Sequence, residues 1–244
     1  MTTQARARSF HRCITPRPGW RRGAYQGTRA MLQRVVVFPA VNATCRPRVF
    51  GASELEGLAG PLVIVANHVS HLDCPLLLRV LPARLRRRTT VAAAADYFYR
   101  TRLRAAAVTL VLGTMPLERT GNAAGLESCA GVLASGGSLL IFPEGTRSRD
   151  GHLGSFKRGA ACLSISTGAP VLPVGIRGLH GVLPAGAWVP HPQRVEVHMG
   201  SLLWPLPGED ATTLTVRIAA AIRQLSEPTP MEQAIEPLQP ARAH

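Results

Sequence analysis

Two short polar motifs, each at the end of an apolar run, carry the residues of this chain best suited to chemistry. The first is Asn67-His68-Val69-Ser70-His71-Leu72-Asp73, after the run 62–66, and the second is Phe142-Pro143-Glu144-Gly145-Thr146-Arg147-Ser148, which begins in the run 139–142. The first motif supplies a histidine and a carboxylate, the usual parts of a general base. The second supplies a glycine turn with side chains that bind anions. Together they indicate a base-assisted transfer onto a phosphate-bearing alcohol.

His68 and Asp73 need a particular local structure to meet. Five positions apart on a continuous helix, they would lie roughly 140° from each other. However, Ser70 and Asp73 have the spacing of a capping box, with Ser70 as the N-cap and the acid at the third helical position. His68 would then lie in the preceding loop and could fold back against Asp73, leaving its other ring nitrogen to accept a hydroxyl proton.

Two other interpretations of this motif remain open at this point. In one, Asp73 only caps the helix and His68 fills a polar niche. In the other, His68, His71 and Asp73 hold a metal ion, as in a metallohydrolase. The remaining histidines form no second ligand cluster, which weighs against the metal site.

The second motif has the composition of an anion-binding turn. Gly145 permits close backbone approach, Thr146 and Ser148 offer hydroxyl groups, and Arg147 offers a bidentate clamp. A solvated charged turn is the alternative.

Two further sites carry cations in places that need explanation. Lys157 and Arg158 stand at the start of a predicted helix, where the helix dipole disfavours cations unless an anion is bound nearby. The run Gly113-Thr114-Met115-Pro116-Leu117 ends in Glu118-Arg119. A surface ion pair of Glu118 with Arg119 or with neighbouring residues would explain these charges without a functional role.

After Pro61 the pattern alternates strands with helices, which predicts an α/β fold. The predicted strands are 62–66, 90–95, 139–142, 171–176 and 194–199. The predicted helices cover 75–80, 122–134 and 156–167, followed by a last helix with Leu214, Ile218, Ala221, Ile222 and Leu225 on one face. The apolar run 108–117 is expected in the core. We expect a single domain with a mostly parallel central sheet flanked by helices, and both polar motifs at its carboxyl edge.

The charge is concentrated at the start of the 244-residue chain, whose net charge is +14. Residues 1–50 contain ten arginines and no acid. We divide the chain into a basic, partly disordered N-terminal arm (1–47), a domain (48–225) and a disordered Pro-rich tail (226–244). Within the arm, 28–41 is either an interfacial helix or a helix packed on the domain. Such basic blocks attract lipid headgroups, nucleic acid or an acidic carrier protein.

Composition excludes several classes of protein. The five cysteines are scattered without a CxxC pair, which opposes a disulfide framework or zinc ribbon and fits a reducing compartment. The sequence contains no run of 18 or more uncharged apolar residues, so we expect no clear membrane-spanning helix. A basic nucleic-acid-binding protein without catalysis is the alternative of another class, but aromatic residues are only 5% of the chain, so no nucleic acid is expected.

The chain resembles the glycerophospholipid acyltransferases. The resemblance rests on four blocks in order: Asn-His-x4-Asp at 67–73, a glycine-to-arginine block at 113–119, Phe-Pro-Glu-Gly-Thr-Arg-Ser at 142–148, and Val-Leu-Pro-Val at 171–174. It covers roughly residues 48–225. The second block departs from the family pattern through its internal proline and a Glu beside Arg119.

The resemblance implies an activity and a set of site residues. The enzyme would move an acyl group from acyl-CoA or acyl-carrier protein to the hydroxyl of a lysophospholipid such as 1-acyl-sn-glycerol-3-phosphate, or of another lysolipid or an amino-lipid. It implies no cofactor and no metal. His68 would be the general base and Asp73 its orienting partner. The acceptor phosphate would be bound by Arg119, Glu144, Gly145, Thr146, Arg147 and Lys157. With the basic arm, this places the protein peripherally on an anionic membrane surface, at the cytoplasmic face. A family member without catalysis is a further alternative.

Overall fold

The computed structural model describes residues 20–58, 60–94, 102–117, 123–148, 152–183 and 190–227. The helices are α2 (Trp20–Leu32), the π-helix η1 (Gln33–Val37), α3 (Phe38–Cys45), the 3-10 helix η2 (Ala52–Leu55), α4 (Asp73–Val80), α5 (Ala83–Arg88), α7 (Arg102–Leu112), α8 (Ala123–Ala134), α9 (Gly159–Thr167), α10 (Leu179–Val182) and α11 (Ala211–Ser226). The strands are β1 (Arg48–Phe50), β2 (Val63–Ala66), β3 (Thr89–Ala94), β4 (Thr114–Leu117), β5 (Ser138–Ile141), β6 (Val171–Arg177) and β7 (Glu196–Met199). The first 19 residues of the expected arm, and the expected tail from 228 onward, lie outside the described ranges.

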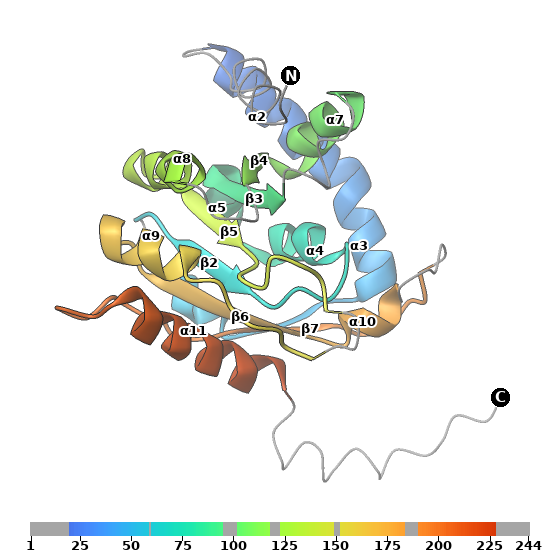
Figure 1. The fold of residues 1–244 in the computed structure, drawn as a ribbon. Coiled ribbons are helices and arrows are strands. Elements are labelled where there is room, and N and C mark those ends of the chain that lie inside the picture. Colours follow the sequence, from blue (N-terminus) through green and yellow to red (C-terminus); the bar gives the residue numbers. More distant parts are fainter. Residues whose placement is uncertain are drawn as a thin grey trace, which may run out of the picture.

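These strands form one sheet in the order β1-β7-β6-β2-β5-β3-β4 (Figure 1). The neighbours from β6 to β4 pair in parallel, whereas β7 runs antiparallel to β6 and β1 follows the direction of β7. The expected α/β class with a mostly parallel central sheet is therefore confirmed. Because β2 and β5 are parallel neighbours, the two polar motifs leave the sheet side by side at its carboxyl edge.

The alternation of side chains along the central strands divides the core into two halves. Ile64 and Ala66 face the cluster that also contains α3, α4, α5 and α10 residues, while Val63 and Val65 face the cluster under α8, α9 and α11. All four β2 side chains are fully buried. A strand buried on both faces reads as a continuous apolar run, which is why 62–66 was recognisable in the sequence.

The N-terminal segment is helical from Trp20 to Cys45 and packs on the domain (Figure 1). Phe38, Val41 and Cys45 are buried in the same cluster as the α4 leucines. Of the two expectations for residues 28–41, the structure therefore shows the helix packed on the domain. The outer side of the same segment nevertheless exposes apolar residues, among them Met31 and Val35 at 58% and 67% exposure.

The apolar run 108–117 is divided between two elements. Helix α7 ends at Leu112 and strand β4 begins at Thr114, with Gly113 between them at φ 69°. A Cβ at Gly113 would meet the Arg29 guanidinium at 2.3 Å, and this guanidinium donates to the Leu112 carbonyl at 2.9 Å. The glycine therefore allows the break and the close approach of Arg29. Within the described ranges, each helix is too short or too polar to span a bilayer.

Candidate active site

The His68 and Asp73 side chains meet directly. Asp73 is fully buried as the first residue of α4, and its Oδ2 lies 2.6 Å from His68 Nδ1. The same oxygen accepts the backbone N–H groups of Val69 at 2.8 Å and Ser70 at 3.0 Å. The loop 67–72 thus wraps around one carboxylate oxygen, which fixes the imidazole with its other nitrogen directed away from Asp73.

The expectation that Ser70 is the N-cap of this helix is wrong, because the helix begins later in the chain. Helix α4 begins at Asp73, and Leu72 occupies the N-cap position. Contacts like those of a capping box form two residues before this N-cap, since Ser70 Oγ accepts from the Leu72 N–H at 3.3 Å while Asp73 accepts from the Ser70 N–H. The Asp73 carboxylate thus supports the loop before the helix, and the regular helix begins at Asp73 itself.

Burial raises the pKa of Asp73, and the hydrogen bond from His68 is the largest opposing effect. The second carboxylate oxygen, Oδ1, is buried and has no hydrogen-bond partner within the described part of the chain. An ionised carboxylate in such a place costs stability that a neutral group would not.

Asp73→Asn should therefore alter the pH dependence of stability. A raised pKa means that the folded wild type holds its proton more tightly than the unfolded chain does, so its free energy of unfolding falls as the pH rises above about 4. The asparagine variant lacks this titration. We expect its stability relative to the wild type to increase as the pH rises above about 4, measured by denaturant unfolding at a series of pH values.

The opposite trend would contradict this account of the carboxylate. If Asp73→Asn lost stability relative to wild type as the pH rose, the hydrogen bonds to Oδ2 would outweigh burial. The Asp73 pKa would then be lowered in the folded state.

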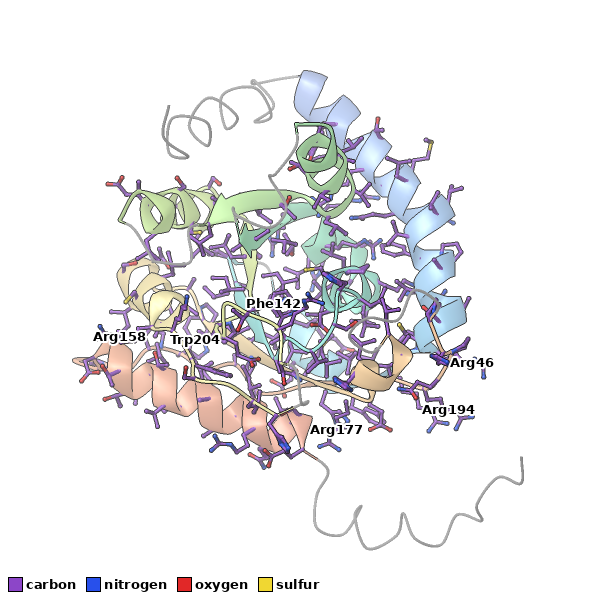
Figure 2. The ribbon with its side chains drawn as sticks, turned by 45° about the vertical axis from the view of Figure 1, so that its right-hand side comes forward. Arg46, Phe142, Arg158, Arg177, Arg194 and Trp204 are labelled. Carbon is purple, nitrogen blue, oxygen red and sulfur yellow. The ribbon has the colours of Figure 1, made fainter. Side chains whose placement is uncertain are left out.

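Three contacts join the first motif to the second. The His68 N–H donates to Glu144 Oε1 at 2.9 Å, and the Ser148 N–H donates to the His68 carbonyl at 2.8 Å. The Phe142 ring stacks on the imidazole, with centroids 4.3 Å apart and planes 22° apart (Figure 2 labels Phe142). The Asp73 bond and the stacked ring together restrict the orientation of the imidazole.

Glu144 acts as a tie between loops. Its second oxygen accepts the Gly154 N–H at 3.0 Å, and the side chain is buried. Both carboxylate oxygens therefore hold backbone amides, so any contribution of Glu144 to acceptor binding would come through the shape of the loop. The roles of Phe142 and Gly154 are not readable from the sequence, because both depend on contacts across the fold.

Asn67 is a further residue that sequence reasoning left without a role. Its side chain donates to the Ile176 carbonyl at 3.0 Å and accepts the Ile176 N–H at 2.8 Å. It therefore continues the pairing of β2 with β6 one residue beyond the end of β2, and it anchors the loop that carries His68. The sequence offered one sign of this role, since Asn67 directly follows a buried strand.

Gly145 and Lys157 lie against each other. Gly145 has φ 70°, and a Cβ there would meet Lys157 Nζ at 2.9 Å. The Lys157 N–H donates to the Pro143 carbonyl at 2.9 Å, and residues 153–157 belong to no helix or strand. Helix α9 consequently begins at Gly159, later than the expected start near 156. The structure thus brings an ammonium group onto the glycine turn of the second motif.

The remaining expected site residues are exposed or lie outside the described ranges. Thr146 and Arg147 are exposed on the loop that follows β5. Arg119 is outside the described residues, two positions after the end of β4. Because β4 runs parallel to β3, and β3 to β5, the chain leaves β4 at the edge of the sheet that carries His68.

Cys74 is not suited to act as a nucleophile. Burial and the adjacent Asp73 carboxylate raise the pKa of its thiol, so no thiolate is available near neutral pH. The side chain packs against the core, as expected. Among the described residues, no group of three or more His, Cys, Asp or Glu side chains is arranged to hold a metal ion.

Comparison with known proteins identifies one family. The model of the family described as Acyltransferase matches residues 46–177. This range contains both polar motifs, the strands that carry them and the His68–Asp73 pair.

Curated relatives match over part of their length. A protein named 1-acyl-sn-glycerol-3-phosphate acyltransferase BAT2, chloroplastic, from Brassica napus is 31% identical over 144 residues, covering 56% of this chain and 39% of that protein. The protein named LPAT1, chloroplastic, from Arabidopsis thaliana is also 31% identical over 144 residues, covering 56% of this chain and 37% of its own length. The matches thus span about two fifths of these two relatives.

A solved structure has the same fold. The crystal structure of the 1-acyl-sn-glycerophosphate acyltransferase PlsC from Thermotoga maritima aligns with a TM-score of 0.61 and 21% sequence identity, covering 90% of this chain and 81% of that one.

Proposed function

This chain belongs to the acyltransferase family, and we propose that it transfers a fatty acyl group from an acyl thioester to the free hydroxyl of a lysophospholipid, 1-acyl-sn-glycerol-3-phosphate. The observation that carries the proposal is the 2.6 Å contact between His68 Nδ1 and Asp73 Oδ2 at the carboxyl edge of the sheet. The names of the relatives from Brassica napus and Arabidopsis thaliana support the choice of acceptor.

The proposed reaction needs one base and no covalent enzyme intermediate. His68 Nε2 takes the proton from the acceptor hydroxyl while the hydroxyl oxygen attacks the thioester carbonyl. Asp73 holds the Nδ1–H tautomer and stabilises the imidazolium that forms. When the tetrahedral intermediate collapses, the carbon–sulfur bond breaks, and the imidazolium returns its proton to the departing thiolate. The products are a diacyl phospholipid and a free thiol.

The second motif supplies the features that a phosphate would need. Lys157 lies over Gly145, and Thr146 and Arg147 are exposed beside it. A phosphate bound here would receive charge-assisted hydrogen bonds, which are stronger and shorter than neutral ones. Arg119, which follows a strand ending at the same edge, would be a further ligand. Glu144 would keep this loop in place by holding the His68 and Gly154 amides.

The donor and the location follow from the same proposal. Acyl-CoA or acyl-carrier protein would supply the thioester. A lysophospholipid with a long acyl chain resides in a bilayer, so the enzyme would work at an anionic membrane surface, associated peripherally at its cytoplasmic face. The ten arginines within residues 1–50 support attraction to such a surface.

An acceptor panel tests the proposal. Purified protein is incubated with labelled acyl-CoA or labelled acyl-carrier protein and, in turn, 1-acyl-sn-glycerol-3-phosphate, glycerol-3-phosphate, lysophosphatidylcholine and a monoacylglycerol. We expect phosphatidate as the main product, with little product from the phosphate-free acceptor. A preference for the monoacylglycerol would contradict the assigned acceptor class.

Arg119→Ala should raise the KM for the phosphate-bearing acceptor by about 10- to 100-fold, the loss of one or two charge-assisted hydrogen bonds. The KM for the donor should hardly change. Arg223→Ala, which removes an exposed arginine from α11, is the matched control and should leave both constants near wild type. An equal loss toward a phosphate-free acceptor would instead assign Arg119 a role in folding.

A further inference from the structure

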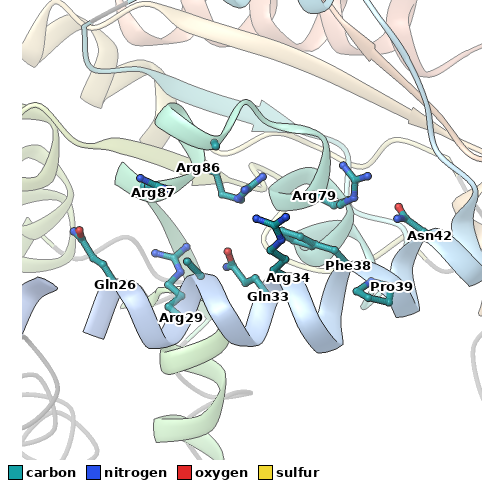
Figure 3. Close-up of a pocket in the computed structure, with 12 residues that line it drawn as sticks. Gln26, Arg29, Gln33, Arg34, Phe38, Pro39, Asn42, Arg79, Arg86 and Arg87 are labelled. Carbon is teal, nitrogen blue, oxygen red and sulfur yellow. The ribbon is translucent and has the colours of Figure 1, made fainter. Parts of the chain in front are cut away.

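A basic pocket lies between the N-terminal helical segment and helices α4 and α5 (Figure 3). Neither His68 nor Asp73 lines it. Its volume is about 400 Å³, within the range of small-ligand sites. Five guanidinium groups line it, from Arg29, Arg34, Arg79, Arg86 and Arg87, and no lining residue is acidic.

The positive charge of this pocket is not neutralised by the protein. None of the five arginines pairs with a carboxylate within the described residues. Burial lowers the pKa of Arg86, and the charges of Arg79 and Arg87 lower it further. Like charges held this close cost free energy unless an anion is bound among them.

Two of the five arginines have structural roles that hold the pocket in shape. Arg86 donates to the Leu81 carbonyl at 3.1 Å, beyond the end of α4, and lies 4.8 Å above the Phe38 ring. Arg29 is 93% buried and donates to the carbonyls of Thr89 and Leu112, yet its Nε has no hydrogen-bond partner. The structure therefore contains an unsatisfied, buried donor in the wall of the pocket.

The other three arginines are available to a ligand. Arg34 and Arg87 are exposed, and Arg79 is half-buried with its guanidinium 5.8 Å from the centroid of the Phe38 ring. Within the described residues, none of these three side chains makes a hydrogen bond to the protein. Figure 3 shows Arg34 and Arg79 on opposite sides of the pocket, with Phe38 between them. Guanidinium groups arranged around one space are well suited to phosphate oxygens, which they bind through pairs of hydrogen bonds.

Exposed apolar residues lie on the same helical segment, on its outer side. Met31, Val35 and Val36 are 58%, 67% and 59% exposed, and Arg34 lies between the first and second of them in the sequence. Apolar side chains beside unpaired arginines are typical of helices that lie in the headgroup region of an anionic bilayer. Binding of a soluble phosphate ligand would not explain why these apolar side chains are exposed.

We propose that the pocket binds the phosphate of an anionic phospholipid headgroup while Met31, Val35 and Val36 enter the bilayer. Such a site would set where the enzyme attaches and which lipid surface it prefers. This inference deepens the proposed membrane association but needs no acyl transfer. Vesicle binding measured without substrates therefore separates its failure from failure of the proposed function.

The test compares two triple variants of the full chain. The pocket variant is Arg34→Gln, Arg79→Gln, Arg87→Gln, and the control, Arg194→Gln, Arg217→Gln, Arg223→Gln, removes equal charge from residue 194 and helix α11. Binding to phosphatidylglycerol-containing vesicles is measured by sedimentation, with pure phosphatidylcholine vesicles as reference. Each pocket arginine should contribute roughly fivefold, so we expect about a 100-fold loss for the pocket variant. The control should lose less than about threefold, since its arginines would lie farther than a Debye length from the bilayer.

Two further arms separate the alternatives. Met31→Ser with Val35→Ser should weaken binding to the same vesicles even at about 0.5 M salt, where charge is largely screened; unchanged affinity would exclude a bilayer contact through these residues. Inorganic phosphate and CoA, tested by thermal shift, should not stabilise the wild type more than the pocket variant. Stabilisation that is specific to the wild-type pocket would assign it to a soluble phosphate ligand and overturn the proposal. So would equal losses of vesicle binding in the two triple variants.

Discussion

His68→Ala is expected to lower kcat by about 10²- to 10⁴-fold, the loss typical of a missing general base. The side chain is held by Asp73 at 2.6 Å and by stacking on Phe142, and it is only partly buried. Its removal should therefore affect the proton transfer more than the fold. Steady-state rates with acyl-CoA and 1-acyl-sn-glycerol-3-phosphate, beside the thermal melting of both proteins, measure the effect.

His71→Ala is the matched control for this variant. His71 belongs to the same motif but is exposed, and no role in the reaction is assigned to it. We expect turnover within about twofold of the wild type, against the 10²- to 10⁴-fold loss of His68→Ala. If the two variants lost activity equally, the loop as a whole, and not the imidazole of His68, would be responsible.

Asp73→Asn should lower kcat by a similar factor, about 10²- to 10⁴-fold, although it keeps the shape of the side chain. A neutral amide can still accept the Val69 and Ser70 amides but cannot stabilise the imidazolium that forms during the reaction. The loss should appear in kcat with little change in the KM for either substrate.

The double variant distinguishes a pair from two separate groups. If His68 and Asp73 act as one unit, His68→Ala with Asp73→Asn should be about as slow as His68→Ala alone. Effects that multiplied would indicate that Asp73 contributes to turnover through something other than His68.

The sequence predicted those parts of the structure that depend on local patterns. The buried strand 62–66 was visible because both of its faces are apolar. The half-exposed strand expected at 194–199, and observed at Glu196–Met199, was visible because polar and apolar residues alternate in it. The meeting of His68 with Asp73 followed from their spacing and from Ser70, since a loop before the helix was the only way for the two side chains to face each other. Parallel strands then predicted that both motifs would lie at one edge.

Contacts between distant segments could not be predicted in the same way. From the sequence, Glu144 was expected to help bind the acceptor phosphate, but its carboxylate accepts hydrogen bonds from the backbone amides of His68 and Gly154. Lys157 was expected within a helix, and its backbone bond to Pro143 keeps it in the loop instead. Gly113 is approached by the guanidinium of Arg29, more than 80 residues earlier in the chain. In each case the deciding interaction joins residues whose proximity only the complete fold establishes.

The most direct test of the central claim is the detection of phosphatidate formed by the purified protein from labelled 1-acyl-sn-glycerol-3-phosphate and acyl-CoA, with free thiol counted in the same reaction. The account predicts that the wild type forms one phosphatidate for each thiol released and that His68→Ala, folded to the same extent, forms almost none. Phosphatidate formation by His68→Ala at a rate near that of the wild type would contradict it, as would thiol release without acylated product.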